Sequence, residues 1–174
     1  FEALEALKRL GAEIEPVELA PMPLEAMYAV FQNEFRQSMD AALVGSTGCP
    51  LTLAEIVAFN GRDPEQYVPY GQRYLKEALD PECSMAAPKY LEAKRRIEAD
   101  FTAPSHELFI ARGITALLTP MASGLAVSGL PSVTLPVGRE DGLPVALVLS
   151  GLAYMEAELI KIAAALEAAL VNAQ

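Results

Sequence analysis

The C-terminal part of the chain, residues 114–170, has the clearest pattern of apolar and polar positions. Apolar residues alternate with other residues over 133–137, and residues 145–149 form a continuous apolar run. Alternation is typical of a strand with two different faces, and the continuous run indicates a strand covered on both faces. From Met155 onward the apolar residues recur at helical spacing. We therefore expect two buried strands followed by a helix that packs back on them.

The first 19 residues combine a helical pattern with an extended one. Apolar residues close to helical spacing run from Phe1 to Leu10, and Gly11 is a typical helix stop. Residues 12–19 alternate acidic with apolar side chains, as in a strand with one face in water. Pro16 lacks an amide hydrogen, which favours an edge position for this strand. Helix followed by strand is one half of an α/β unit.

Residues 24–113 carry mostly helical patterns. Met and aromatic residues recur every fourth position from Met27 to Leu43, and such a stripe favours a buried core over a cofactor site. Thr52 and Glu55 have the spacing of a capping box at the start of a helix that runs to about Gly61. A turn is expected from Asp63, followed by a helix over residues 69–79.

A further long helix is expected after Pro88. Pro104 predicts a kink or break in it, and Ser105 is placed to cap a restarted helix that ends at Gly113.

Composition and charge narrow the classes of function. With 174 residues and 52% hydrophobic content the chain can bury one sizeable core, as one domain or part of one. Its 13 basic and 23 acidic residues give a net charge of −10, which disfavours nucleic acid as a partner. The sequence has neither a secretion signal nor an apolar run of membrane-spanning length, so we expect a cytoplasmic protein without a membrane partner. Cys49 and Cys83 have no metal-site spacing and are interpreted as structural thiols.

The chain contains no recognisable catalytic constellation. The motifs of serine hydrolases, zinc hydrolases and nucleotide-binding loops are absent from the sequence. Ser123, Ser128 and Ser132 lie among small and apolar residues without a neighbouring lysine or histidine, and turn roles are favoured for them. His106 is a lone histidine and receives no role. From the residues alone we assign no catalytic residue, no metal ligand and no cofactor.

Seven segments, in the same order and spread over nearly the whole chain, resemble the amidase-signature enzymes, a family of amide hydrolases. Each is weak alone, but together they are specific. They are residues 1–19 (a helix followed by a strand), 34–43 (beginning Glu-Phe-Arg), 52–60 (Thr-Leu-Ala-Glu-Ile-Val-Ala-Phe-Asn), 69–72 (Pro-Tyr-Gly-Gln), 117–120 (Leu-Leu-Thr-Pro), 129–131 (Gly-Leu-Pro) and 142–145 (Gly-Leu-Pro-Val).

The resemblance implies an α/β fold, part of an α/β/α sandwich with a mixed central sheet covered by helices. Residues 1–174 would be the C-terminal portion of a single amidase-signature domain, helix-rich over 24–113 and ending in a strand-strand-helix segment over 114–174. The resemblance further implies a bacterial amidase that hydrolyses a carboxylic amide to a carboxylate and ammonia or an amine, through an acyl-enzyme. The Ser–Ser–Lys triad of the family lies upstream of this portion, and no residue of this chain matches it.

The resemblance also implies which substrate and which partners this portion contacts. Thr119, Pro120 and Met121 would form one wall of the substrate pocket for a small-molecule amide. The remainder of the amidase polypeptide would be its partner, a homodimer is possible, and no cofactor is expected. Family members usually have a longer segment between Pro120 and Gly129, so we expect that this join carries a deletion or omits residues. The start at Phe1, within a helical pattern, likewise suggests a piece of a longer polypeptide.

Two alternatives remain open from the sequence. One is the amidase subunit of an aminoacyl-tRNA amidotransferase, although the acidic balance and the Glu34-Phe35-Arg36 segment favour a free-standing amidase. The other is a non-catalytic, amidase-like interaction fragment.

Overall fold

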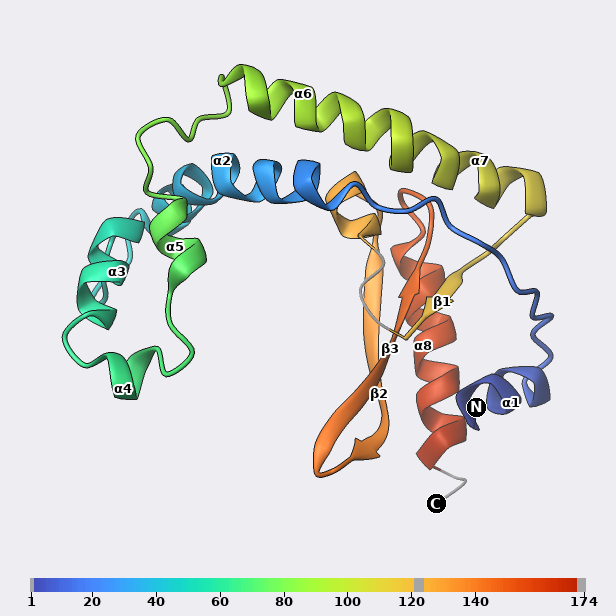
Figure 1. Ribbon diagram of the computed structural model, residues 1–174. Coiled ribbons are helices and arrows are strands. Elements are labelled where there is room, and N and C mark those ends of the chain that lie inside the picture. The colour runs from blue at the N-terminus through green and yellow to red at the C-terminus, as the bar shows by residue number, and fades with distance from the viewer. Residues whose placement is uncertain (1, 121–123, 172–174) are drawn as a thin grey trace. The chain divides into compact units, whose positions relative to one another are not determined.

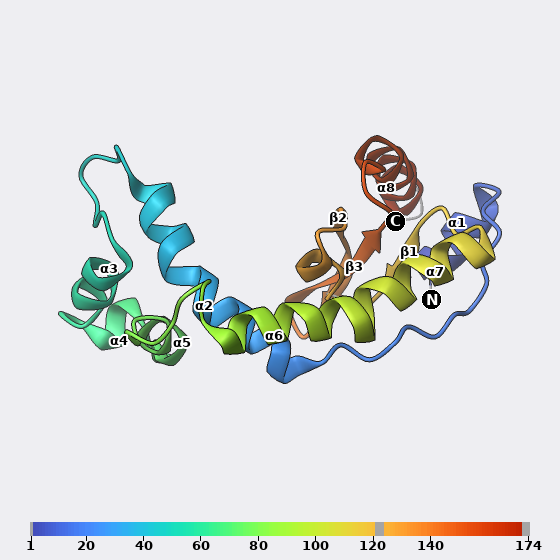
Figure 2. The ribbon, with the colours of Figure 1, turned by 90° about the horizontal axis from the view of Figure 1, so that it is seen from above.

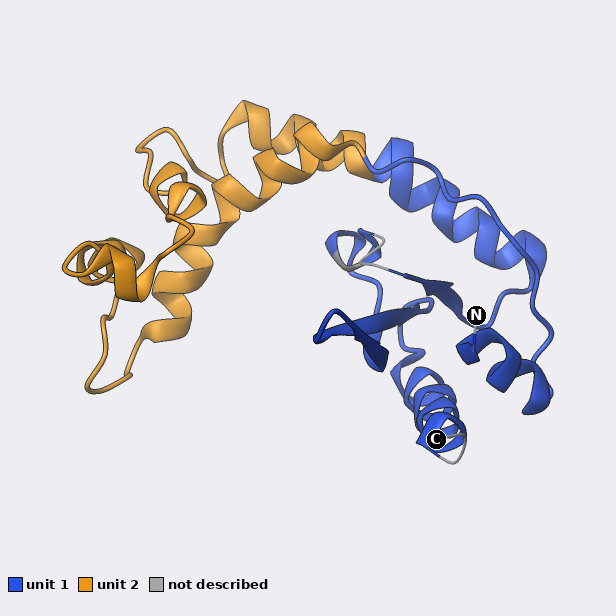
Figure 3. Cartoon of the chain, turned by 60° about the horizontal axis from the view of Figure 1, so that its bottom comes forward, with its two compact units in different colours: residues 1–22, 98–174 blue, residues 23–97 orange. Residues whose placement is uncertain are grey.

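The computed structural model of the chain describes residues 2–120 and 124–171. It divides into two compact units, drawn in different colours in Figure 3. The sheet unit comprises residues 1–22 and 98–174, and the helical unit comprises residues 23–97. No helix among the described residues is both long enough and apolar enough to cross a membrane.

The sheet unit is built on three antiparallel strands, in the order β1-β3-β2 (Figure 1). They are β1 (Leu117–Thr119), β2 (Ser132–Glu140) and β3 (Leu143–Ser150). Positive φ angles at Asp141 and Gly142 form the tight turn between β2 and β3. Both predicted strands are therefore confirmed. The expected cover on both faces holds only at the end of β3, because its first residues, beginning with Leu143, lie exposed near the hairpin tip.

Helices cover both faces of this sheet. On one face, α1 (Glu2–Arg9) and α8 (Glu156–Val171) pack against residues such as Leu135 and Leu149. On the other face, Leu117 packs with Phe101 and Phe109, which come from a π-helical turn (Glu98–Thr102) and from α7 (Ala103–Arg112). Figure 2, seen from above, shows the strands between α8 and α7. The expected α/β class is confirmed, and α8 packs back on the strands as predicted.

The strand predicted over residues 12–19 is wrong. These residues are extended but pair with no strand in the described structure. Their alternation has a different cause: Val17 and Leu19 pack against the cluster that contains Phe101, while Glu15 forms an ion pair with Arg112 of α7. Val17 and Leu19 are thus partly buried against this cluster and take no part in the sheet.

The helical unit is organised around α2 (Leu24–Leu43) and α6 (Pro88–Ile97), which pack side by side (Figure 1). The remaining helices of the unit are α3 (Leu53–Asn60), α4 (Pro64–Tyr67) and α5 (Arg73–Glu77). The helix predicted over 69–79 is therefore shorter than expected, and a short helix replaces part of the turn expected from Asp63.

The predicted core stripe of α2 is also wrong in its orientation. The buried residues of α2 are Ala26, Val30 and Asn33, whereas Phe31 and Phe35 are exposed. Small side chains allow two helix backbones to approach closely, so the small-residue face of α2 packs in the unit and the aromatic face does not.

Pro104 does interrupt the helix that begins at Pro88, as predicted, but the interruption is a π-helical turn and the cap differs. The turn Glu98–Thr102 directly precedes α7, in which Pro104 occupies the first turn. A widened turn of this kind accommodates the amide that proline lacks and the bulk of its ring. Ser105 does not cap α7, because it lies inside the helix and is buried.

Candidate functional site

The predicted pocket wall begins at the end of β1. Thr119 is the last residue of this strand, pairs in register with Val148 of β3 and is half-buried. Pro120 follows and is exposed. Met121 lies outside the described residues. The chain therefore leaves the sheet at Thr119, on the strand at one edge of the three.

A second group of hydroxyls lies where residues 125–128 meet the π-helical turn. A 3-10 helix, η2 (Leu125–Ser128), packs beside the π-helical turn. There, the Thr102 Oγ1 hydroxyl donates a hydrogen bond to Ser128 Oγ at 2.7 Å. Ser105 Oγ, one helical turn further on, is buried without a hydrogen-bond partner among the described residues. These hydroxyls come from segments that are distant in sequence.

Ser128 and Ser132, two of the three serines in the small and apolar C-terminal segment, are each hydrogen-bonded to another hydroxyl. Ser132 Oγ and Ser150 Oγ lie 2.8 Å apart, on neighbouring strands and in register. Ser150 is completely buried. Ser123 lies outside the described residues. Hydroxyl-to-hydroxyl pairs of this kind lack the general base that a nucleophilic serine needs, so a structural role remains the better interpretation of Ser128 and Ser132.

The described residues contain no group of three or more His, Cys, Asp or Glu side chains that could hold a metal ion. His106 is half-buried in the first turn of α7. Cys49 is exposed, Cys83 is half-buried, and both are free thiols.

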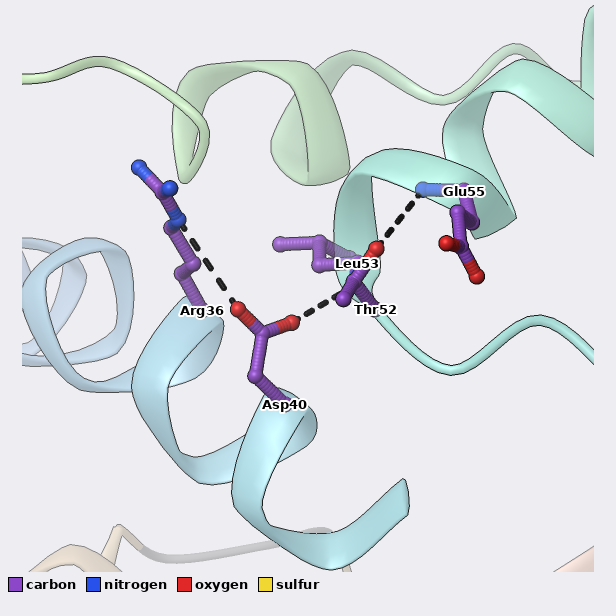
Figure 4. Close-up of polar contacts among 5 residues, drawn as sticks. All are labelled: Arg36, Asp40, Thr52, Leu53 and Glu55. Atoms are coloured by element: carbon purple, nitrogen blue, oxygen red, sulfur yellow. Dashed lines mark hydrogen bonds and ion pairs between the residues drawn. The ribbon is translucent and has the colours of Figure 1, made fainter. Parts of the chain in front are cut away.

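A polar network in the helical unit joins α2 to the start of α3 (Figure 4). The backbone amide of Leu53 donates to Asp40 Oδ1 at 2.7 Å, and Arg36 Nε lies 3.9 Å from Asp40 Oδ2. The predicted capping box is present, since the Glu55 amide donates to Thr52 Oγ1 at 3.2 Å. Its second half differs: Glu55 Oε2 accepts from the amide of Leu51, one residue before the cap, at 2.7 Å.

Asn33 is the buried polar residue of this region. Its side chain is only 2% exposed, donates to the carbonyl of Ala29 at 2.7 Å and accepts from the amide of Ser84 at 2.8 Å. Because a buried amide needs its partners, these bonds fix the turn before Ser84 against α2.

Next to Asn33, a cleft of about 270 Å³ opens on the surface of the helical unit. Its lining consists of polar and charged residues of α2 together with one thiol: Asn33, Arg36, Gln37, Asp40 and Cys83. This set can donate and accept hydrogen bonds but pairs no nucleophile with a base, so it is suited to contacts with a small polar group and not to catalysis.

Sequence reasoning missed Asn33 and Asp40, since isolated polar residues on a helix are usually solvated. The only available signal is that Asn33 falls on the same helical face as Ala26 and Val30.

The Glu34-Phe35-Arg36 segment has a structural role in the helical unit. Tyr90 of α6 donates its hydroxyl to Glu34 Oε1 at 2.6 Å, and Lys94 Nζ lies 3.8 Å from the same oxygen. The hydrogen bond to the Glu34 carboxylate, together with burial, raises the pKa of the Tyr90 phenol. This contact ties α2 to α6.

Comparison with known proteins gives two kinds of result. No family model matches the chain, and no curated protein sequence matches it. Solved structures do match. The native peptide amidase from Stenotrophomonas maltophilia aligns with 31% sequence identity and a TM-score of 0.71, covering 96% of this chain and 38% of that protein. The peptide amidase in complex with the competitive inhibitor chymostatin aligns equally, with a TM-score of 0.70 and coverage of 96% and 39%.

An amidase family protein from Bacillus anthracis strain Ames is similar in fold. It aligns with a TM-score of 0.71 at 21% identity, over 98% of this chain and 35% of that protein. The chain thus spans less than two fifths of the length of the proteins it matches.

Proposed function

Because this chain is related to the amidase-signature enzymes over 96% of its length, we propose that it is the C-terminal portion of an amide hydrolase. The observation that carries the proposal is the match to peptide amidase, in which sequence identity and fold agree over nearly the whole chain. Fold alone would not define an activity, but here the structural match comes with 31% sequence identity over 96% of the chain.

The proposed reaction is the hydrolysis of a carboxylic amide. A serine hydroxyl attacks the amide carbonyl, the amine or ammonia leaves with the proton, and the resulting ester is hydrolysed by water to the carboxylate. In this proposal the nucleophile, the second serine and the basic lysine belong to a part of the protein outside this chain. A peptide amide is the first substrate to assay, because the matched enzyme is a peptide amidase.

The chain itself would supply strands, covering helices and one wall of the pocket. Thr119, Pro120 and Met121 are proposed for that wall. The position of Thr119 at the end of a strand supports this, since chain segments that leave a sheet are common sites of ligand contact.

Two other assignments fit less well. An amidase subunit of a tRNA-dependent amidotransferase would approach RNA, whereas the net charge of −10 repels a phosphate backbone. A non-catalytic interaction fragment would leave many apolar helix residues uncovered. We propose a cytoplasmic enzyme, which a chain with two free thiols and no disulfide between them would suit.

The proposal is tested on the full-length product of the gene that encodes this chain. Its intact mass is measured first, and ammonia release from an amidated dipeptide follows. We expect a mass well above 18.6 kDa and turnover that alanine substitution of the upstream serine or lysine abolishes. A native product of 18.6 kDa, or a longer one that lacks the lysine and the serine pair, would refute the proposal.

The pocket wall is tested separately. Thr119→Ala is expected to raise KM several-fold. Thr134→Ala, at an exposed position on β2, is the matched control and should leave KM unchanged. Equal KM values for the two variants would remove Thr119 from the wall.

A further inference from the structure

Helix α2 presents apolar side chains on two opposite faces. Ala26, Val30 and Asn33 form the face that is buried in the helical unit. The opposite face, which we name the outer stripe of α2, consists of Leu24, Tyr28, Phe31 and Phe35, with exposed fractions of 59%, 44%, 47% and 36%. A surface helix normally has one apolar face, and apolar residues on both indicate a helix that is covered from both sides.

The outer stripe is a continuous feature. Its residues are separated by four, three and four positions, which aligns them along one side of a helix with about 3.6 residues per turn. Tyr74 of α5 extends it, since its ring stacks on Tyr28 with centroids 6.0 Å apart and planes 7° from parallel. Tyr74 is itself 58% exposed. Contiguous exposed aromatic residues of this kind mark interaction surfaces.

On this basis we propose that the outer stripe of α2 is the surface on which the remaining portion of the amide hydrolase packs. The inference rests on the proposed function. The length of the matched enzyme supports this occupant: the chain corresponds to 38% of peptide amidase, so most of such a protein would lie outside the chain. A segment of the same polypeptide also reaches the stripe at a high effective concentration, which a second copy does not.

The charges around the stripe fit a protein partner better than a lipid surface. Glu25 and Glu34 lie next to stripe residues on α2 and pair with Arg96 and Lys94. Arg36 follows Phe35, and Arg73 lies over the Tyr74 ring. The acidic leaflet of a membrane attracts segments rich in basic residues, whereas the charges beside this apolar surface are of both signs.

The test compares chemical labelling of one stripe position in two proteins. Phe31→Cys is introduced into the 174-residue chain and into the full-length gene product, in a background where Cys49, Cys83 and any further cysteine are serine. Maleimide labelling rates are measured natively and in urea. Lys89→Cys, at an exposed charged position on α6, is the matched control.

We expect position 31 to react at least tenfold more slowly in the native full-length protein than in urea, and position 89 to react at nearly the same rate in both. Equal rates at position 31 would overturn the inference. Protection already present in the 174-residue chain, at a concentration where light scattering shows only monomers, would overturn it too, because the stripe would then be covered within the chain. Protection that appears only where light scattering shows a dimer would assign the stripe to a second copy and overturn it.

Amide hydrolysis by the same samples separates the two proposals. Activity together with fast labelling at position 31 would leave the proposed function intact and refute the docking surface. Protection in a full-length protein that lacks the catalytic serines and lysine would refute the proposed function, and with it the identity of the occupant.

Discussion

At the residue scale, the start of α3 depends on a side chain from another helix. The first helical amide, that of Leu53, has no partner within its own helix and is satisfied by Asp40 of α2. Leu53 is completely buried, so its amide cannot turn to water instead. A single carboxylate thus couples the position of α3 to that of α2.

Asp40→Ala is expected to lower the free energy of unfolding by about 1–3 kcal/mol, because it leaves a buried amide without an acceptor. Asp40→Asn keeps a side-chain carbonyl at the same place and should cost clearly less. Urea unfolding of the two variants gives the comparison. Equal losses for both would show that the hydrogen bond to Leu53 contributes little.

The Tyr90 phenol provides a second test at this scale. Its hydrogen bond to Glu34 and its burial raise its pKa, so the folded protein holds the phenolic proton more strongly than the unfolded chain does. The resulting stabilisation is complete below the ordinary tyrosine pKa of about 10 and is lost as pH rises through the raised value. Glu34→Gln should lower the pKa of Tyr90, measured by the ultraviolet absorbance of tyrosinate.

Tyr90→Phe is the control for that titration, since it identifies the component that belongs to Tyr90 among the six tyrosines. If the latest-titrating component persists in Tyr90→Phe, it belongs to another tyrosine.

At the scale of elements, several helices end next to a glycine whose backbone is in the left-handed conformation. α7 ends at Gly113, whose φ of 61° lies in the left-handed region. Gly138, at the irregularity in the register of β2 and β3, has no such angle, and an added side chain would meet no atom within 4 Å.

These two glycines make a matched pair. Gly113→Ala is expected to destabilise the protein by about 1 kcal/mol, since an L-residue is strained in the left-handed conformation. Gly138→Ala should be neutral or slightly stabilising, because it restricts the unfolded chain without strain. Thermal unfolding measures both, and a larger loss for Gly138→Ala would contradict the assignment.

Elements with a long local pattern could be predicted from the sequence. The segments 24–43, 133–137, 145–149 and 155–170 form the expected helices and strands because periodicity is a local property. The periodicity does not indicate which face of a helix is buried against its neighbours. The pattern from Met27 to Leu43 predicts a buried stripe on α2, but the buried residues are Ala26, Val30 and Asn33 on another face of the helix.

Features that depend on distant residues were also missed. β1 is only three residues long and exists through its pairing with β3, about 30 positions later. Asn33 is buried because its partner Ser84 lies 51 positions away. Of the candidate pocket wall, Thr119 came from the family resemblance and not from any pattern in the residues, and its role remains a prediction.

At the scale of the whole molecule, the chain exposes two surfaces that could bind another protein surface. The outer stripe of α2 is apolar, and β2 is an edge strand of the described sheet. Pro136, the irregular register beside it and the charged residues Arg139 and Glu140 make that edge a poor template for another strand. The helix stripe has no comparable protection.

We therefore expect the 174-residue chain to associate with itself as its concentration rises. Phe31→Glu combined with Phe35→Glu should weaken this association markedly without a large loss of stability, because both positions are exposed. Sedimentation velocity measures the effect. Ile160→Glu, at an isolated exposed position of α8, is the control, and an equal effect from it would show that general charge repulsion is responsible.

The division into units has a consequence for the order of folding. The helical unit is continuous in sequence, whereas the sheet unit joins residues 1–22 to residues 98–174. Helix α1 packs on α8, so it has no partner until nearly the whole chain has been synthesised. Contacts between such distant residues form slowly, since the loop between them must close first. The helical unit should therefore gain protection from hydrogen exchange earlier than α1 does.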